Sequence, residues 1–299
     1  MPTNLEYFFT DLAQYLINGV AQGSIYALIA LGYTMVYGII KLINFAHGEF
    51  YMIGAFIGFY CIGSGMPLYI AFPAAMFGAG IIAVVVEKLI YRPIRDVGRI
   101  VALITALGAS LFFQYLGQGV LGADPKAFPQ AIEEKTYMFG EIIFTRTQII
   151  IMVSTFVLMA ILYWLVNHTK TGKAMRATSF NKNAAELMGI NTDRIISFTF
   201  FVGAALAGAA GVLVGMYYNT VEPMMGLIPG LKAFIAAVLG GIGIIPGAVI
   251  GGLTLGIAEN LVVGFWISTY RDAIAFAILI IILLVKPTGI LGKNRKEKV

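Results

Sequence analysis

Cysteine and histidine are scarce in this sequence. Among 299 residues there are one cysteine, Cys61, and two histidines. A lone cysteine excludes a disulfide framework and a cysteine-based metal site within one chain, and two histidines far apart add little to a metal centre. We therefore expect no metal site in this chain.

The motifs of common enzymes and of nucleotide binding are missing. The chain contains neither a His-Glu-x-x-His zinc pattern nor a Gly-x-Ser-x-Gly nucleophile elbow. Its nearest approach to a phosphate-binding loop, TKTGKA at 169–174, lacks the earlier glycine and the Ser or Thr after Lys173. We therefore expect that the chain is not an enzyme, has no catalytic residues and binds no cofactor. If ATP drives its action, another subunit binds the ATP and its Mg²⁺.

Hydrophobic residues, in contrast, are abundant. They make up 59% of the chain against 12% charged residues, and the mean hydropathy is +0.87. Apolar runs recur from near residue 16 to residue 285, and runs of about 20 residues cross a hydrocarbon core of about 30 Å as helices. The first 40 residues hold no Lys or Arg, so we expect the first apolar segment to remain rather than to act as a cleaved signal peptide. The sequence predicts an integral membrane protein with no soluble domain between its spans.

The predicted fold class is all-α. Hydropathy predicts a polytopic bundle of eight or nine transmembrane helices in a single domain over residues 1–299. Gly and Pro in GGIGIIPGAVIGG (240–252) predict short or broken helices near 228–250, which need protein around them at membrane depth. The predicted spans are 16–40, 48–62, 67–86, 100–120, 147–166, 195–217, 228–243, 246–265 and 270–286.

Basic residues predict the orientation. The segments 87–99, 167–194 and 286–299 hold 14 of the 20 Lys and Arg residues, which places them in the cytoplasm, whereas the more acidic loop 121–146 suits the outer face. Nine spans then put the N-terminus outside and the C-terminus in the cytoplasm; eight spans result if the first or seventh segment does not cross. Topology and anionic lipid headgroups account for the net charge of +5, so we expect no nucleic-acid partner.

Small residues recur at intervals of four. This spacing gives one helix face a smooth stripe, which lets helix backbones approach closely in a membrane. The stripes are Gly203, Ala207, Gly211 and Gly215; Ala248, Gly252 and Gly256; and Gly54 and Gly58.

The stretch INFAHGEF (43–50) places polar residues beside an apolar span. Asn44, His47 and Glu49 fall at the predicted cytoplasmic end of two spans, in a short turn or a re-entrant segment. Polar groups at this depth are costly unless they face protein, water or an interface. We expect Asn44 to cap a helix and Gly48 to allow close approach. A direct place in a solute path is the alternative, and catalysis is disfavoured.

A second group of polar residues lies in apolar surroundings near the C-terminal end. Lys232 follows Pro229 closely, so we expect its ammonium group to snorkel to the interface. Glu259 and Asn260 lie deep in their run. Glu259 is therefore neutral, paired with a residue of another helix, or faces a water-filled path.

The basic loop TKTGKAMRATSFNKNAAELMGINTDRI (169–195) predicts a short helix from about Asn183. Ala184, Leu187 and Met188 form a small apolar face, and Gly189 ends the helix. A helix this short is unstable alone, which favours a partner surface over an ordinary surface helix.

Three stretches together resemble one protein family. They are GSIYALIALGYTMVYGIIKLINFAHGEFYMIGAF (23–56), RATSFNKNAAELMGIN (176–191) and PGLKAFIAAVLGGIGIIPGAVIGGLTLGIAEN (229–260). The chain is similar over nearly its whole length to LivH-type permease subunits of branched-chain amino-acid ABC importers. One departure is the pair Ile244 and Ile245, where the family usually has a small or polar residue before Ile-Pro.

The resemblance implies a permease subunit in a prokaryotic cytoplasmic membrane, forming half of a translocation pathway for Leu, Ile or Val. The implied partners are a LivM-type permease, two ABC ATPase subunits and an extracytoplasmic solute-binding protein. Relatives that carry amides, urea or other amino acids leave the solute open, and an ion-coupled secondary transporter is a further alternative.

The resemblance also implies a coupling role for the loop, whereas the pathway candidates come from their polar side chains in apolar runs. The loop 167–194 would couple to the ATPase through Arg176, Ala184, Ala185, Glu186, Leu187 and Gly189. The candidates for the pathway or for helix positioning are Asn44, His47, Glu49, Glu259 and Asn260.

Overall fold

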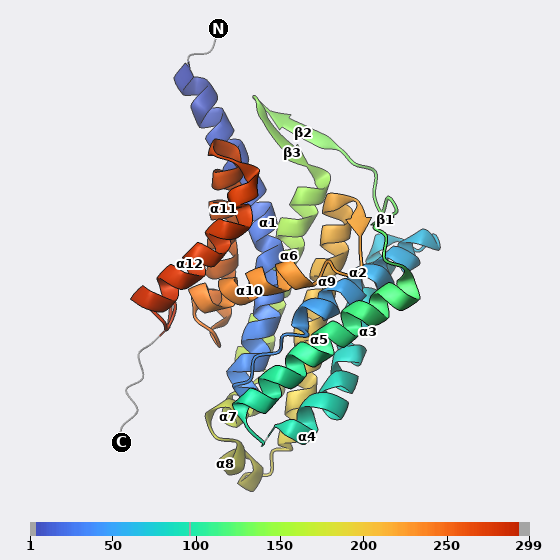
Figure 1. Ribbon diagram of the computed structural model, residues 1–299, viewed down its shortest axis with the longest axis vertical. Coiled ribbons are helices and arrows are strands. Elements are labelled where there is room, and N and C mark those ends of the chain that lie inside the picture. Colours follow the sequence, from blue (N-terminus) through green and yellow to red (C-terminus); the bar gives the residue numbers. More distant parts are fainter. Residues whose placement is uncertain (1–3, 96, 293–299) are drawn as a thin grey trace.

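A computed structural model describes residues 4–95 and 97–292 of the chain (Figure 1). All nine predicted spans are helices, and apart from the start of the first they begin and end within three residues of the prediction. The first helix begins twelve residues earlier than predicted. These helices are α1 (Asn4–Ile40), α2 (His47–Gly63), α3 (Leu68–Val86), α5 (Arg99–Leu121), α6 (Arg146–His168), α9 (Thr192–Tyr218), α10 (Leu227–Gly240), α11 (Ile245–Phe265) and α12 (Arg271–Val285).

The remaining elements are short. A π-helical segment, Glu87–Tyr91, joins α3 to α4 (Arg92–Ile94), while α7 (Lys170–Phe180) and α8 (Lys182–Leu187) lie between α6 and α9, and a 3₁₀ turn (Ser268–Tyr270) precedes α12. The prediction of an all-α chain missed four strands: β1 (Lys126–Ala127) pairs with β4 (Thr220–Val221), and β2 (Thr136–Phe139) pairs with β3 (Ile142–Thr145). Strands of two to four residues are too short for a clear alternating pattern.

The described part of the chain contains seven helices that are long and apolar enough to cross a membrane. The shorter helices α2 and α10, of 17 and 14 residues, are not among them. The predicted break after α10 is confirmed: Gly241 and Gly243 have φ of 107° and 91°, and Pro246 lies in the first turn of α11. Positive φ suits glycine because it has no Cβ, and proline suits a helix start.

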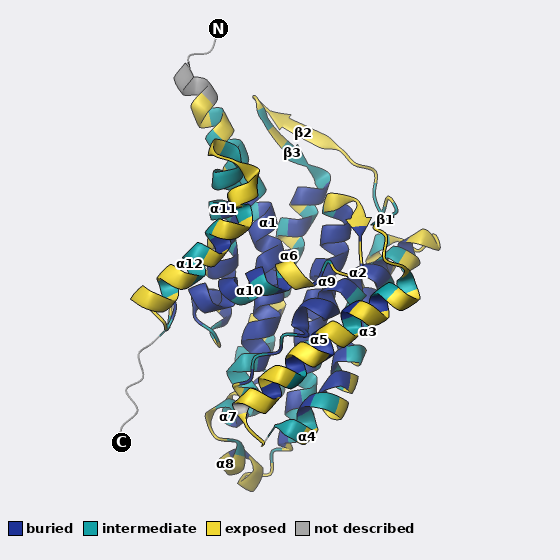
Figure 2. Cartoon of the chain, in the orientation of Figure 1, coloured by how far each residue is buried: buried dark blue, intermediate teal, exposed yellow. Residues whose placement is uncertain are grey.

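The helices α1 and α9 form the centre of the bundle. About three quarters of the residues in the apolar stretch of each helix are buried (78% for α1 and 72% for α9). The corresponding share for the stretch that contains α12 is 6%. Figure 2 shows the buried residues concentrated along the central helices and exposed residues along α5 and α12. Apolar side chains exposed on the outer helices suit contact with lipid or with another membrane subunit.

The predicted small-residue stripes lie at helix contacts. Gly252 of α11 lies against α1, where a Cβ would come within 2.6 Å of the backbone nitrogen of Ala27. Gly211 of α9 similarly lies against the backbone of Tyr51 and Ala55 in α2. The prediction of close helix packing is confirmed at these contacts.

The two groups of loops lie at opposite ends of the bundle. The hairpin β2–β3 lies near the first turns of α1, and α4, α7 and α8 lie together at the other end (Figure 1). Residues 293–299 of the predicted basic segment 286–299 lie outside the described residues.

Candidate functional site

The helix α2 begins inside the bundle. The imidazole of His47 lies where a Cβ of Gly32 would stand, and Gly32 also contacts Gly203 of α9. Gly32 precedes the end of α1, Ile40, by eight residues, or about 12 Å along a helix. The segment before α2 therefore turns back into the bundle, as in the re-entrant alternative.

The side chain of Asn44 does not cap α2. Its Oδ1 accepts a hydrogen bond of 2.6 Å from the hydroxyl of Tyr91, while the N-cap residue Ala46 makes no side-chain cap bond. The backbone carbonyl of Asn44 accepts instead from the N–H of His47 at 3.0 Å. The capping prediction is wrong because Tyr91, 47 positions away in sequence, takes the amide oxygen.

Gly48 allows the predicted close approach. A Cβ on Gly48 would lie 3.2 Å from the Cα of Gly230 in α10. The first turns of the two short helices, α2 and α10, thus meet inside the bundle, where Figure 1 shows α10 crossing the other helices.

Glu49 joins α2 to α5. Its Oε1 accepts hydrogen bonds of 2.8 Å from Ser110 and from Gln114. Asn44, His47 and Glu49 are each 1% exposed. This burial favours a role in positioning helices over direct contact with a solute.

Glu259 lies between two cationic side chains. Its Oε1 is 2.9 Å from Nζ of Lys232, and its Oε2 accepts from Nε of Arg271 at 3.1 Å. The hydroxyl of Tyr26 donates to the same Oε2 at 2.9 Å. Of the three alternatives for Glu259, the structure shows the one in which it pairs with residues of other helices.

Lys232 is buried, with 3% of its surface exposed. The prediction that it snorkels to the interface is wrong, because Nζ also lies 2.7 Å from Oδ1 of Asp272. Two carboxylates, from α11 and α12, thus hold the ammonium group inside the protein. We call Lys232, Glu259, Arg271 and Asp272 the charged cluster.

Polar side chains of α1 and α11 surround the charged cluster. Gln22 donates to Glu259 at 3.2 Å and accepts from Arg271 and, at 3.0 Å, from Asn260. Gln22 lies within the apolar stretch Phe8–Ile40, so the charged cluster lies beside a candidate membrane span. A charge at a helix centre costs about 2.5–3.5 kcal/mol on insertion scales, so this wall must face protein or water.

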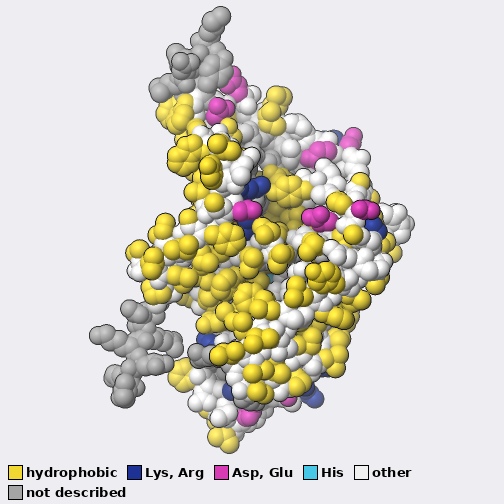
Figure 3. Space-filling model, viewed as in Figure 1, with side chains coloured by type: hydrophobic (Ala, Val, Ile, Leu, Met, Phe, Trp, Pro, Cys, Tyr) yellow, Lys and Arg dark blue, Asp and Glu magenta, His cyan; other side chains and the backbone are white. Residues whose placement is uncertain are grey.

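A cavity of about 550 Å³ opens beside the charged cluster, and we call it the central cavity. Asp272 and Arg271 are 55% and 31% exposed, while Lys232 and Glu259 are almost completely buried. Figure 3 shows basic and acidic side chains together in the upper middle of a largely hydrophobic face. The lining of the central cavity includes Gln22, Tyr26, Tyr51, Val214, Tyr218, Glu222, Met224, Met225, Ile228, Lys232, Thr269, Arg271 and Asp272.

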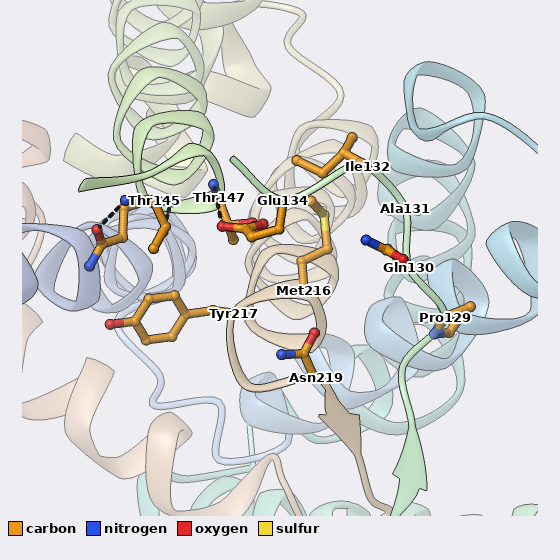
Figure 4. A pocket seen from close by; sticks show the side chains of 11 residues that line it. Pro129, Gln130, Ala131, Ile132, Glu134, Thr145, Thr147, Met216, Tyr217 and Asn219 are labelled. Atoms are coloured by element: carbon orange, nitrogen blue, oxygen red, sulfur yellow. Dashed lines mark hydrogen bonds between the residues drawn. The ribbon is translucent and has the colours of Figure 1, made fainter. Parts of the chain in front are cut away.

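A second cavity, of about 570 Å³, lies beneath the loop 121–146. Figure 4 shows Glu134 and Thr147 pointing toward one another, and the threonine hydroxyl donates to the carboxylate at 2.6 Å. Tyr217 and Asn219, at the end of α9, form the opposite wall. Sequence analysis treated Glu134 only as part of an acidic loop, so this site was missed.

The loop 167–194 contains two helices. Arg176 of α7 donates to the backbone carbonyl of Val166, which ties α7 to α6. In α8, Asn181 caps the first turn by accepting from the N–H of Ala184 at 3.0 Å, and Gly189 follows the helix with φ of 81°. The predicted short helix therefore begins one residue before Asn183, and Gly189 ends it as predicted.

The apolar residues of α8 point in two directions. Leu187 and Met188 are 89% and 82% exposed, whereas Ala185 is 4% exposed and faces the protein. Glu186 accepts from the hydroxyl of Thr192 at the start of α9. Leu187 and Met188, with the exposed Ala184, therefore form an exposed apolar surface at this helix.

An ion-pair cluster that sequence analysis missed lies at the same end. Glu87, fully buried in the π-helical segment, accepts from Arg95 at 2.5 Å, from Arg92 at 3.2 Å and from Ser197 at 2.6 Å. Arg95 also binds Asp193 at 2.8 Å. The cluster joins α3, α4 and the first turns of α9. The basic residues of 87–99 indicated orientation, but nothing in their spacing indicated these partners.

Two comparisons, with a family model and with sequence relatives, place the chain among transport permeases. Residues 15–283 match the family described as the permease component of branched-chain amino acid transport systems. The chain is 45% identical to the high-affinity branched-chain amino acid transport system permease protein LivH of Salmonella typhimurium, over 97% of this chain and 99% of the relative. It is 44% identical to the corresponding protein BraD of Pseudomonas aeruginosa, over 96% of this chain and 97% of the relative.

A solved structure shares the fold. It is described as a metal-chelate type ABC transporter in an inward-facing conformation, with a TM-score of 0.50 over 94% of this chain and 89% of that chain. Because the sequences are only 16% identical, this likeness concerns the arrangement of helices alone.

Proposed function

Since the chain belongs to the permease-component family of branched-chain amino acid transport systems, we propose that it forms half of the translocation pathway for Leu, Ile and Val in an ATP-driven importer. It is a multi-pass protein of the cytoplasmic membrane and a transport subunit rather than an enzyme. The observation that carries the proposal is the likeness to LivH over almost the whole of both chains. The central cavity adds a polar wall beside candidate membrane spans, which suits a solute path.

The proposed topology has nine crossings, with the N-terminus outside and the C-terminus in the cytoplasm. In this topology α2 and α10 each complete a crossing together with the non-helical segment that precedes them. The meeting of their first turns inside the bundle supports this arrangement. So does the separation of the basic loops from the loop 121–146 at opposite ends (Figure 1).

The proposed complex contains a LivM-type permease, two ATPase subunits that bind ATP and Mg²⁺, and an extracytoplasmic binding protein. This chain contributes one permease domain, and α8 within the coupling loop 167–194 contacts an ATPase through Leu187 and Met188. The ion-pair cluster of Glu87, Arg95 and Asp193 then links the start of α9 to α3, so that these helices move together as a rigid body. ATP drives the cycle because it binds the outward-open and inward-open states of the complex with different affinities. A ligand that bound both states equally would leave the equilibrium between them unchanged.

Reconstitution tests this function directly. The two permeases, the ATPases and the binding protein are placed in proteoliposomes, and uptake of radiolabelled leucine is measured with ATP or a non-hydrolysable analogue. We expect uptake only with hydrolysable ATP. Uptake that persists without ATP and collapses with an ion gradient would favour the secondary-transporter alternative, whereas uptake of amides or urea but not leucine would reassign the solute. The pairing of Glu259 with two cations weighs against its use in ion coupling.

A further inference from the structure

Two opposite charges are adjacent on the wall of the central cavity. Arg271 and Asp272 are consecutive residues at the start of α12 and are 31% and 55% exposed. An exposed charge inside a membrane protein needs water or a ligand beside it, because lipid does not solvate it. Arg271 and Asp272 both line the central cavity, so a ligand in that cavity can reach a positive and a negative charge together.

The balance of charge indicates the kind of ligand. The charged cluster holds two cations and two carboxylates, linked by the contacts of Lys232 with Glu259 at 2.9 Å and with Asp272 at 2.7 Å. A zwitterion leaves this balance unchanged, whereas a solute with a single charge adds an unpaired one. Glu222 also lines the central cavity and adds a negative charge to its wall, which disfavours a simple carboxylate.

The rest of the lining suits an aliphatic side chain. Val214, Met224 and Ile228 contribute apolar surface, and Met225 lies beside them. Methionine is flexible and fills irregular space, so one lining can accept different branched side chains. The volume of about 550 Å³ lies within the range of roughly 300–1,000 Å³ typical of small-molecule sites.

From these features we infer that the central cavity binds the transported amino acid during passage, with Arg271 contacting its α-carboxylate and Asp272 its α-ammonium group. The inference rests on the proposed function but goes beyond it. It gives this chain a site that recognises the backbone of the solute, separate from the selection made by a binding protein.

Protection of a cysteine tests the site without the binding protein. In the assembled complex of permeases and ATPases, Cys61→Ala removes the native thiol and Thr269→Cys places one in the lining. A small charged methanethiosulfonate reagent then reports access. We expect leucine at ten times its dissociation constant to slow modification about tenfold, because only the empty site reacts. The analogues 4-methylpentanoate and 3-methylbutylamine, which each lack one charge, should protect much less.

Matched variants separate binding from unrelated effects. Lys135→Cys, whose parent side chain is 57% exposed in the outer loop, should react at the same rate with and without leucine. Asp272→Asn should weaken protection of Thr269→Cys about tenfold or more through loss of one charged hydrogen bond, while Lys232 keeps Glu259 as a partner. If Thr269→Cys fails to assemble, Ser268→Cys takes its place in the same lining.

The outcomes distinguish the two proposals. If the wild-type complex with its binding protein takes up leucine but leucine does not protect the cysteine, the site assignment is wrong. Equal protection by 4-methylpentanoate would also overturn it. If the wild-type complex takes up no leucine at all, the proposed function fails instead.

Discussion

The ammonium nitrogen of Lys232 lies 2.9 Å from Oε1 of Glu259, and both side chains are almost completely buried. Since the two residues come from α10 and α11, their contact bridges the helix break at Gly241. Removing one partner of a buried ion pair leaves an uncompensated charge, which destabilises far more than replacing both partners by apolar groups. The pair therefore fixes the position of the short helix α10.

Glu259→Gln is expected to destabilise the protein. The change keeps the shape of the side chain but removes the charge that faces Lys232 and Arg271, at a cost of about 3 kcal/mol. The midpoint of thermal unfolding of the purified complex in detergent should fall clearly. Glu133→Gln, at a carboxylate that is 78% exposed, should change stability by less than about 0.5 kcal/mol.

A Glu259→Gln protein as stable as wild type would show that the side chain acts as a neutral hydrogen-bonding group. If Glu259→Leu were also without effect on stability and uptake, Glu259 would have no role in either.

Leu187→Asp and Met188→Asp are expected to uncouple the permease from its ATPase. Both side chains are more than 80% exposed on α8, so the changes should leave the fold intact. A charge in a hydrophobic contact should weaken retention of the ATPase on the purified permease and lower uptake per molecule of ATP hydrolysed.

Ala185→Asp provides the contrast. Ala185 is 4% exposed, so a carboxylate there should lower the folded yield of the permease itself rather than only its coupling. Full assembly and uptake by Leu187→Asp and Met188→Asp would show that α8 does not contact the ATPase through this face.

The sequence allowed the helices to be predicted well, because membrane spans depend on long local runs of apolar residues. It left the depth of α2 open between a short turn and a re-entrant segment. The segment from Lys41 to Ala46 mixes polar and apolar residues, and the contact of His47 with Gly32 shows that it turns back into the bundle. The strands β2 and β3 were missed because each has only four residues.

The polar partners were beyond prediction for a different reason. Gln22 and Glu259 are hydrogen-bonded although 237 positions separate them, and no local pattern links such residues. Depth in an apolar run correctly indicated that Glu259 needs a partner. For Lys232 the nearby proline suggested an interfacial position, but tertiary contacts with Glu259 and Asp272 determine where the side chain lies.

Gly252→Val is expected to loosen the contact between α11 and α1. A Cβ at this position would come within 2.6 Å of the backbone of Ala27, and overpacking of this kind costs about 1–3 kcal/mol. Gly119→Val in α5 is the matched control, because no atom lies within 4 Å of a Cβ built there. Thermal unfolding should show a lower midpoint for Gly252→Val alone. Equal midpoints for both variants would mean that the α1–α11 contact adjusts without strain.

Tyr91→Phe separates the two roles considered for Asn44. The change removes the 2.6 Å hydrogen bond to Oδ1 of Asn44 and leaves that buried oxygen without its donor, which costs about 1–3 kcal/mol. If Asn44 only positions the re-entrant segment, thermal stability should fall while uptake per assembled complex stays the same. Tyr60→Phe, at a side chain that is 52% exposed, should change neither. Loss of uptake without loss of stability in Tyr91→Phe would instead place Asn44 in the solute path, because the orientation of its amide would then matter to transport.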